Sequence, residues 1–175
     1  MNRRNSNSLC LECGLCCNGV IFADVQLQPG DNTARLQSLG LALISNRGSK
    51  TGIQKFDQPC TAFDGCRCQI YSERPKYCRE FECLLLKSVK AGQTKYPEAQ
   101  RTIRSAVERV KKVKRLLREL GDVDEDIALG KRFRRMKRQL ESRPLNDETA
   151  DTFGELTLAV HDLNVWLSGS FYPAS

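Results

Sequence analysis

The spacing of apolar residues changes near residue 95, and this change divides the chain into two parts. Beyond this point apolar residues recur at intervals of three and four, which is the period of an amphipathic helix. We expect three helices, over residues 97–120, 122–143 and 146–169. Their apolar stripes comprise Ile103, Val107, Val110, Val113, Leu117 and Leu120; Leu129, Phe133, Met136 and Leu140; and Phe153, Leu156, Val160, Leu163 and Leu167. Such helices favour a helical hairpin or a three-helix bundle.

The residues around these stripes support the expected bounds. Pro97 suits the first turn of a helix, and the acidic residues 122–126 suit the N-terminus of the second helix. Pro144 disfavours helix for the residue before it, Asn146 can cap the third helix, and Gly169 can close it. The apolar pattern and the residues that interrupt it therefore predict the same helices.

The N-terminal part has shorter and less regular patterns. Residues 20–27 are apolar at their start and alternate toward their end, which predicts a strand. Residues 41–45 and 51–56 flank a Gly-Ser-Lys turn and predict a hairpin. A cap at Asp31 or Asn32 predicts a short helix between these strands. We therefore expect an α+β fold, in which a small irregular core with short strands precedes the helices.

Length and composition describe a folded chain. It has 175 residues, of which 40% are hydrophobic and 28% are charged, and this suits one compact domain or one domain with a helical extension. No uncharged apolar run reaches the roughly 18 residues of a membrane helix, so we expect no membrane-spanning segment. Residues 1–8 are basic but no apolar segment follows them, so we expect no secretory signal and a cytoplasmic location.

Positive charge is concentrated in the predicted helices. Residues 90–143 carry a net charge of +9, whereas residues 144–175 carry −5 and residues 1–89 carry +3. The residues considered for contact with nucleic acid or an acidic protein are Arg101, Arg104, Lys111, Arg115, Arg134 and Arg138. The alternative is a solvated helix face, partly neutralised by the acidic residues of the last helix. Because no aromatic residues for base stacking are interleaved with this charge, nucleic-acid binding would be phosphate binding without sequence readout.

All nine cysteines lie between residues 10 and 83. A disulfide framework would leave one of the nine cysteines unpaired. In a reducing cytoplasm, closely spaced cysteines more often bind metal or carry out redox chemistry. We therefore favour metal binding over a disulfide scaffold. On this basis the chain divides into a mobile tail (residues 1–9), a cysteine-cluster metal-binding domain (residues 10–89) and a helical region packed on it (residues 94–169).

The first cysteine group comprises Cys10, Cys13, Cys16 and Cys17. Its two consecutive two-residue spacings predict a loop at residues 10–18 that turns back on one centre, and Gly14 can supply the positive φ that such a turn needs. The side chains of adjacent residues diverge. Cys16 and Cys17 therefore fit two metals, or a polynuclear cluster, more easily than a single ion.

The second group comprises Cys60, Cys66, Cys68, Cys78 and Cys83. Four thiolates complete a tetrahedral zinc site, and four also hold an iron–sulfur cluster. Two groups of four would make two zinc sites, or one zinc site and one cluster site, with one cysteine left over. The spacing therefore indicates metal but does not separate zinc from iron–sulfur.

The cysteine motifs resemble those of a known family. The matching residues are Cys10, Cys13, Cys16 and Cys17, then Pro59 and Cys60, then Cys68, Gln69, Ile70, Tyr71, Arg74, Pro75, Cys78, Arg79 and Phe81. In order and spacing they resemble the YkgJ family, also called the CxxCxxCC family, which is described as a zinc- or iron-chelating domain. The resemblance covers roughly residues 10–83 and does not include the helices after about residue 90.

This resemblance implies a set of metal ligands. The ligands that it implies are Cys10, Cys13, Cys16, Cys17, Cys60, Cys68 and Cys78, with Cys83 at a position that many relatives fill. Cys66 has no counterpart and is expected to be the cysteine left over. From the residues themselves, Arg74, Lys76 and Arg79 surround Cys78 and are expected to lower thiol pKa values and to offset thiolate charge.

The expected function is therefore that of a metal-binding protein whose thiolates chelate zinc or iron. Zinc is favoured because it explains an all-cysteine site without a redox partner. Its first role would be structural, since so small a core needs a stabilising cross-link. One alternative is an iron–sulfur redox protein, which as an enzyme would be an oxidoreductase; another is a zinc module that contacts nucleic acid. The single histidine, His161, excludes any mechanism that needs a histidine pair.

Overall fold

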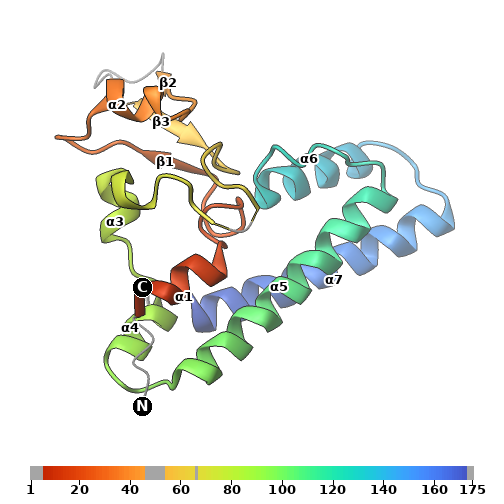
Figure 1. The fold of residues 1–175 in the computed structure, drawn as a ribbon. Helices are drawn as coiled ribbons and strands as arrows, with labels where there is room; N and C mark the ends of the chain where they lie inside the picture. Colours follow the sequence, from red (N-terminus) through yellow and green to blue (C-terminus); the bar gives the residue numbers. More distant parts are fainter. Residues whose placement is uncertain (1–5, 46–53, 66, 173–175) are drawn as a thin grey trace.

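The computed structural model describes residues 6–45, 54–65 and 67–172, and it confirms the α+β class (Figure 1). The strands are β1 (Asp24–Gln26), β2 (Ile44–Ser45) and β3 (Gln54–Asp57). The helices are α1 (Ser6–Cys13), α2 (Thr33–Ser38), α3 (Lys76–Glu80), α4 (Leu84–Lys90), α5 (Tyr96–Glu119), α6 (Leu129–Glu141) and α7 (Asp147–Ser170), with a 3₁₀ turn, η1, at Tyr71–Glu73. None of the helices within these ranges combines the length and apolar character needed to cross a bilayer.

The three strands form one antiparallel sheet with β3 at its centre. The antiparallel pairing of β2 with β3 confirms the pairing of the predicted hairpin, although of residues 41–45 only residues 44 and 45 form strand. Residues 46–53, which include the predicted turn, lie outside the described residues. The strand predicted at residues 20–27 is confirmed only for residues 24–26. The amide of Ile21 instead donates to the carbonyl of Leu15 (3.0 Å), so at this residue the chain closes a turn on the first cysteine motif.

The first cysteine motif begins in a helix. Because α1 spans Ser6–Cys13, the loop predicted at residues 10–18 is wrong for its first four residues. Residues 6–9, which the sequence assigned to a mobile tail, form the start of this helix, and residues 1–5 lie outside the described ranges. Leu9 is only 2% exposed and belongs to the hydrophobic core. Since so short a helix is marginal in isolation, this packing is what stabilises it.

Three long helices form the C-terminal part, as predicted. The longest two, α5 and α7, run side by side in opposite directions, and α6 packs against α5 (Figure 1). Asn146 caps α7 as expected, because its Oδ1 accepts from the amide of Thr149 (2.9 Å). Gly169 does not end α7, which continues to Ser170.

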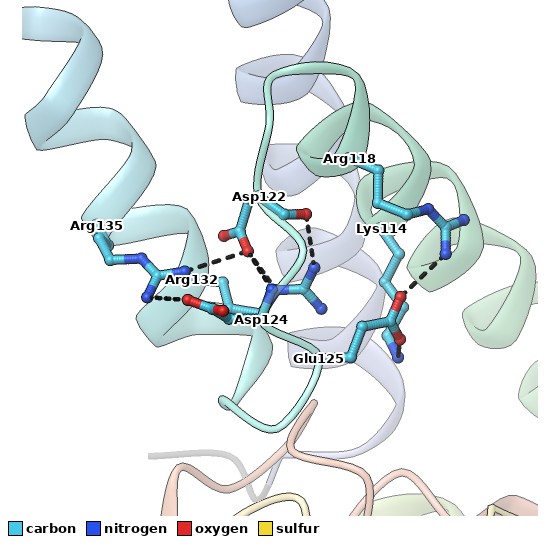
Figure 2. Close-up of polar contacts among 7 residues, drawn as sticks. All are labelled: Lys114, Arg118, Asp122, Asp124, Glu125, Arg132 and Arg135. Atoms are coloured by element: carbon cyan, nitrogen blue, oxygen red, sulfur yellow. Dashed lines mark hydrogen bonds and ion pairs between the residues drawn. The ribbon is translucent and has the colours of Figure 1, made fainter.

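The second predicted helix begins later than expected, because residues 122–126 form a link before α6 (Figure 2). The side chain of Asp122 is buried; its Oδ1 lies 3.3 Å from Nε of Arg132 and accepts a hydrogen bond from Arg135 (3.2 Å). Arg132, which is 1% exposed, also donates to the main-chain oxygen of Asp122 (3.4 Å). The acidic run therefore supports α6 through side-chain ion pairs and not as its N-terminal residues.

Two hydrophobic clusters organise the molecule. The first joins the inner faces of α5, α6 and α7 to α4 and to the start of the first cysteine motif, including Leu9 and Leu15. The second surrounds the sheet and includes Val25, Phe56 and Ile70. Helix α4 was not predicted, although the apolar run that begins at Leu84 is its sequence signal. Of the eight cysteines that the structure describes, Cys60 belongs to the second cluster, and each of the other seven packs against one of the two clusters.

Candidate metal site

One cavity of about 100 Å³ is lined by members of both hydrophobic clusters. All eight predicted ligands line it: Cys10, Cys13, Cys16, Cys17, Cys60, Cys68, Cys78 and Cys83. These eight are free thiols. Cys66 lies outside the described residues. The fold thus brings together two cysteine segments that are more than forty residues apart in the sequence.

Helix α1 and the turn that follows it position the first thiols. Cys10 and Cys13 are three residues apart on α1 and therefore share one face of the helix. Gly14 has a φ of +65°, as expected, and this conformation turns the chain so that the carbonyl of Gly14 accepts from the amide of Cys17 (2.9 Å). Cys83 reaches the same region because it is the N-cap residue of α4, which packs against α1.

The remaining thiols come from the chain around the sheet. The amide of Cys60 donates to the carbonyl of Cys17 (2.8 Å), which ties the two cysteine segments together. Cys68 pairs with Phe63 in an isolated antiparallel bridge, and Cys78 lies on α3. Short hydrogen-bonded turns, and not long elements, therefore hold these side chains at the cavity.

Burial is the main cause that raises the pKa of every one of these thiols. It raises the pKa of Cys13, Cys17 and Cys78 to about 12, and neighbouring thiols add to the effect because nearby thiolates repel each other. A basic neighbour, Arg74, lowers the pKa of several of these thiols, as expected, but burial raises each of these pKa values by more. The thiols are protonated at neutral pH unless a metal ion replaces the proton.

Arg74 is a cation that acts on thiols from both cysteine segments. Its Nε donates to the carbonyl of Tyr71 (2.8 Å), and its guanidinium lies over the Tyr71 ring, 3.6 Å from the centroid. Against the larger effect of burial, its charge lowers the pKa of Cys10, Cys17, Cys68 and Cys78. Lys76 and Arg79, also expected to offset thiolate charge, are exposed and do not line the cavity.

The donor chemistry of this cavity fits a thiophilic metal. Sulfur ligands suit both zinc and iron–sulfur clusters, and the cavity is otherwise mostly apolar. Within the described ranges, no three His, Cys, Asp or Glu side chains already converge closely enough to hold one metal ion. A cysteine side chain turns about a single Cα–Cβ bond, and this rotation is the motion by which the thiols would converge on a metal.

The basic residues considered for nucleic-acid contact are spread over α5 and α6. Lys111 is paired with Glu108 (2.8 Å) and Arg115 with Glu119 (2.9 Å). Glu155 of α7 also lies 3.8 Å from Arg115, as expected for acidic residues of the last helix. Arg101, Arg104, Arg134 and Arg138 are exposed. This arrangement is that of a solvated, partly neutralised surface and does not favour the nucleic-acid alternative.

The comparisons with known proteins identify one family. A model named CxxCxxCC, described as a "putative zinc- or iron-chelating domain", matches residues 9–112. No curated protein and no solved structure matches the chain.

The family match extends further than the resemblance seen in the sequence, because it includes α4 and most of α5. The structure explains this extension. Tyr96 and Gln100, at the start of α5, both donate to the carboxylate of Glu12 on α1 (2.9 and 2.8 Å). The first turns of α5 therefore belong physically to the cysteine-bearing part. The spacing of the cysteines alone contained no signal for this contact.

Proposed function

The chain belongs to the CxxCxxCC family, and from that premise we propose that it chelates zinc or iron through the thiolates of Cys10, Cys13, Cys16, Cys17, Cys60, Cys68, Cys78 and Cys83. The observation that carries this proposal is that all eight side chains line a single cavity as free thiols. A cytoplasmic location, which we also propose, accords with thiols that persist only in a reducing compartment.

Zinc is the metal that we favour. A closed zinc site takes four cysteines and needs no further partner, whereas an iron–sulfur centre that carries electrons needs access to a redox partner. Chelation would also stabilise the fold, because the second hydrophobic cluster rests on a sheet whose strands have two to four residues. The first role of the metal is therefore structural.

The residues around the cavity have distinct parts in this chemistry. The thiols lose their protons as they bind the metal. The positive charge of the metal ion then stabilises the buried thiolates, which burial alone disfavours. Arg74, held by Tyr71, offsets the negative charge of the resulting thiolates. Apolar neighbours from both clusters, among them Leu15 and Phe56, keep water from the ligands.

Anaerobic purification followed by metal and sulfide analysis tests the proposal. We expect colourless protein with stoichiometric zinc and no acid-labile sulfide. Brown protein with iron, acid-labile sulfide and a broad visible absorption band would refute zinc and support the iron–sulfur alternative. Reversible reduction of that protein would then indicate a redox function. Protein that retains neither metal, and that binds neither when they are added under reducing conditions, would refute chelation itself.

A further inference from the structure

Cys16 and Cys17 are adjacent in the sequence but belong to different hydrophobic clusters. Cys16 packs against the first cluster, with the long helices, and Cys17 packs against the second, with the sheet. The two residues follow a tight turn, which the amide of Cys17 closes on the carbonyl of Gly14 (2.9 Å). The other thiols follow the same division.

The thiols on the side of the helices form one group. Cys10, Cys13, Cys16 and Cys83 all pack against the first cluster. They come from α1, from the turn after it and from the N-cap of α4, and α1 packs directly on α4. The first and the last of the eight cysteines along the chain therefore lie in the same part of the molecule.

The thiols on the side of the sheet form the other group. Cys17, Cys60, Cys68 and Cys78 all belong to the second cluster or pack against it. The hydrogen bond between Cys60 and Cys17 and the bridge between Cys68 and Phe63 fix the backbone of three of them. Phe63 is itself tied to Cys60, since its amide donates to the Cys60 carbonyl (2.9 Å).

Electrostatic interactions divide the thiols in the same way. After burial, which is the larger cause, every pair of thiols within each group is coupled, because one member of the pair raises the pKa of the other. Couplings between the groups involve only Cys17, the neighbour of Cys16. Because such interactions weaken with distance, this pattern accords with the division of the thiols by packing.

We propose that the cavity holds two separate four-thiolate metal centres, one bound by Cys10, Cys13, Cys16 and Cys83 and the other by Cys17, Cys60, Cys68 and Cys78. This inference rests on the proposed chelating function and assigns each thiol to one metal centre. Four thiolates suffice for a tetrahedral zinc ion and equally for an iron–sulfur cluster, so the division holds for either metal.

The division gives each metal centre a different mechanical role. The first centre fastens α1 to α4, and through them to the helices. The second fastens the first cysteine motif to the chain around the sheet. The Cys16–Cys17 peptide unit joins the two centres, so each stabilises the position of the other.

Single substitutions at the adjacent pair test the assignment. Zinc, iron and acid-labile sulfide are measured per chain in purified wild-type protein and in the variants Cys16→Ser and Cys17→Ser, which serve as matched controls for each other. We expect two centres in the wild type and one in each variant. We expect Cys13→Ser/Cys16→Ser to retain one centre and Cys16→Ser/Cys17→Ser to retain none. Loss of all metal in both single variants would indicate one shared polynuclear cluster and overturn the assignment.

A measurement on wild-type protein keeps the test decisive if a variant does not fold. A chelator first removes part of the metal, and the thiols that it frees are alkylated. Molecules that retain one metal centre are then selected by native mass spectrometry, and the alkylated cysteines in them are mapped. We expect the four protected thiols to be one complete group. A protected set that mixes Cys16 with Cys60 or Cys68 would overturn the assignment while chelation stands. Wild-type protein that never holds zinc or iron would refute the proposed function, and this inference with it.

Discussion

Gly19 lies just after the first cysteine motif, where that motif touches the start of α6. Its carbonyl accepts a hydrogen bond from the amide of Leu129 (2.9 Å), and its φ is +79°. A methyl group added at this position would lie 2.9 Å from Cα of Ala128 and 3.3 Å from the nitrogen of Pro59. These neighbours are backbone atoms, which cannot turn aside as a flexible side chain can. Gly19→Ala therefore tests how closely the cysteine motif and the helical part are joined.

Two costs add in this variant. A non-glycine residue in the left-handed region costs about 1–2 kcal/mol, and overpacking against fixed neighbours costs about 1–3 kcal/mol more. We therefore expect Gly19→Ala to lower the free energy of unfolding by about 2–5 kcal/mol, a large part of the stability of a small domain. Gly30 provides the matched control. It also has a positive φ (+93°), but an added methyl group would meet nothing within 4 Å, so Gly30→Ala carries the backbone cost alone.

Chemical denaturation of both variants, at the metal content of the purified protein, measures the difference. We expect the free energy of unfolding of Gly19→Ala to be about 1–3 kcal/mol lower than that of Gly30→Ala. Equal stability of the two variants would refute the reasoning, because it would mean that the contact between Gly19 and the start of α6 does not constrain the chain.

Other predictions concern the buried ion pair and the metal ligands. Asp122→Ala leaves the guanidinium of Arg132 buried without its carboxylate (Figure 2), and we expect denaturation to show a loss of about 3–5 kcal/mol; replacing both residues by apolar ones of similar size should cost less than this single change. Arg74→Ala should weaken metal binding about 10- to 100-fold in competition with a chelator, because it removes a charge that offsets the thiolates, and Arg74→Lys should weaken it less. Cys66→Ser should leave the metal content unchanged, whereas Cys13→Ser should lower it and destabilise the fold; an unchanged content in Cys13→Ser would contradict its role as a ligand.

Much of the helical part could be predicted because its signal is local. The apolar period of α5 and α7 extends over many turns, and the cap at Asn146 is read directly from the residue type. The start of α6 was misplaced for a tertiary reason. Residues 122–126 have the acidic composition of a helix N-terminus, but burial of Asp122 against Arg132 holds them in a link, and no pattern along the chain encodes that burial.

The candidate metal-binding atoms could be predicted without the fold. The number and spacing of the cysteines, and the motif that they share with a family, predict sulfur as the donor. How these thiols are grouped depends on the packing of the folded chain. Cys16 and Cys17 are neighbours along the chain, yet each packs against a different core, and Cys83 joins Cys10 only because α4 packs on α1. The physical reason is that spacing along the chain describes local turns, whereas the division of the thiols depends on which apolar surfaces are buried together.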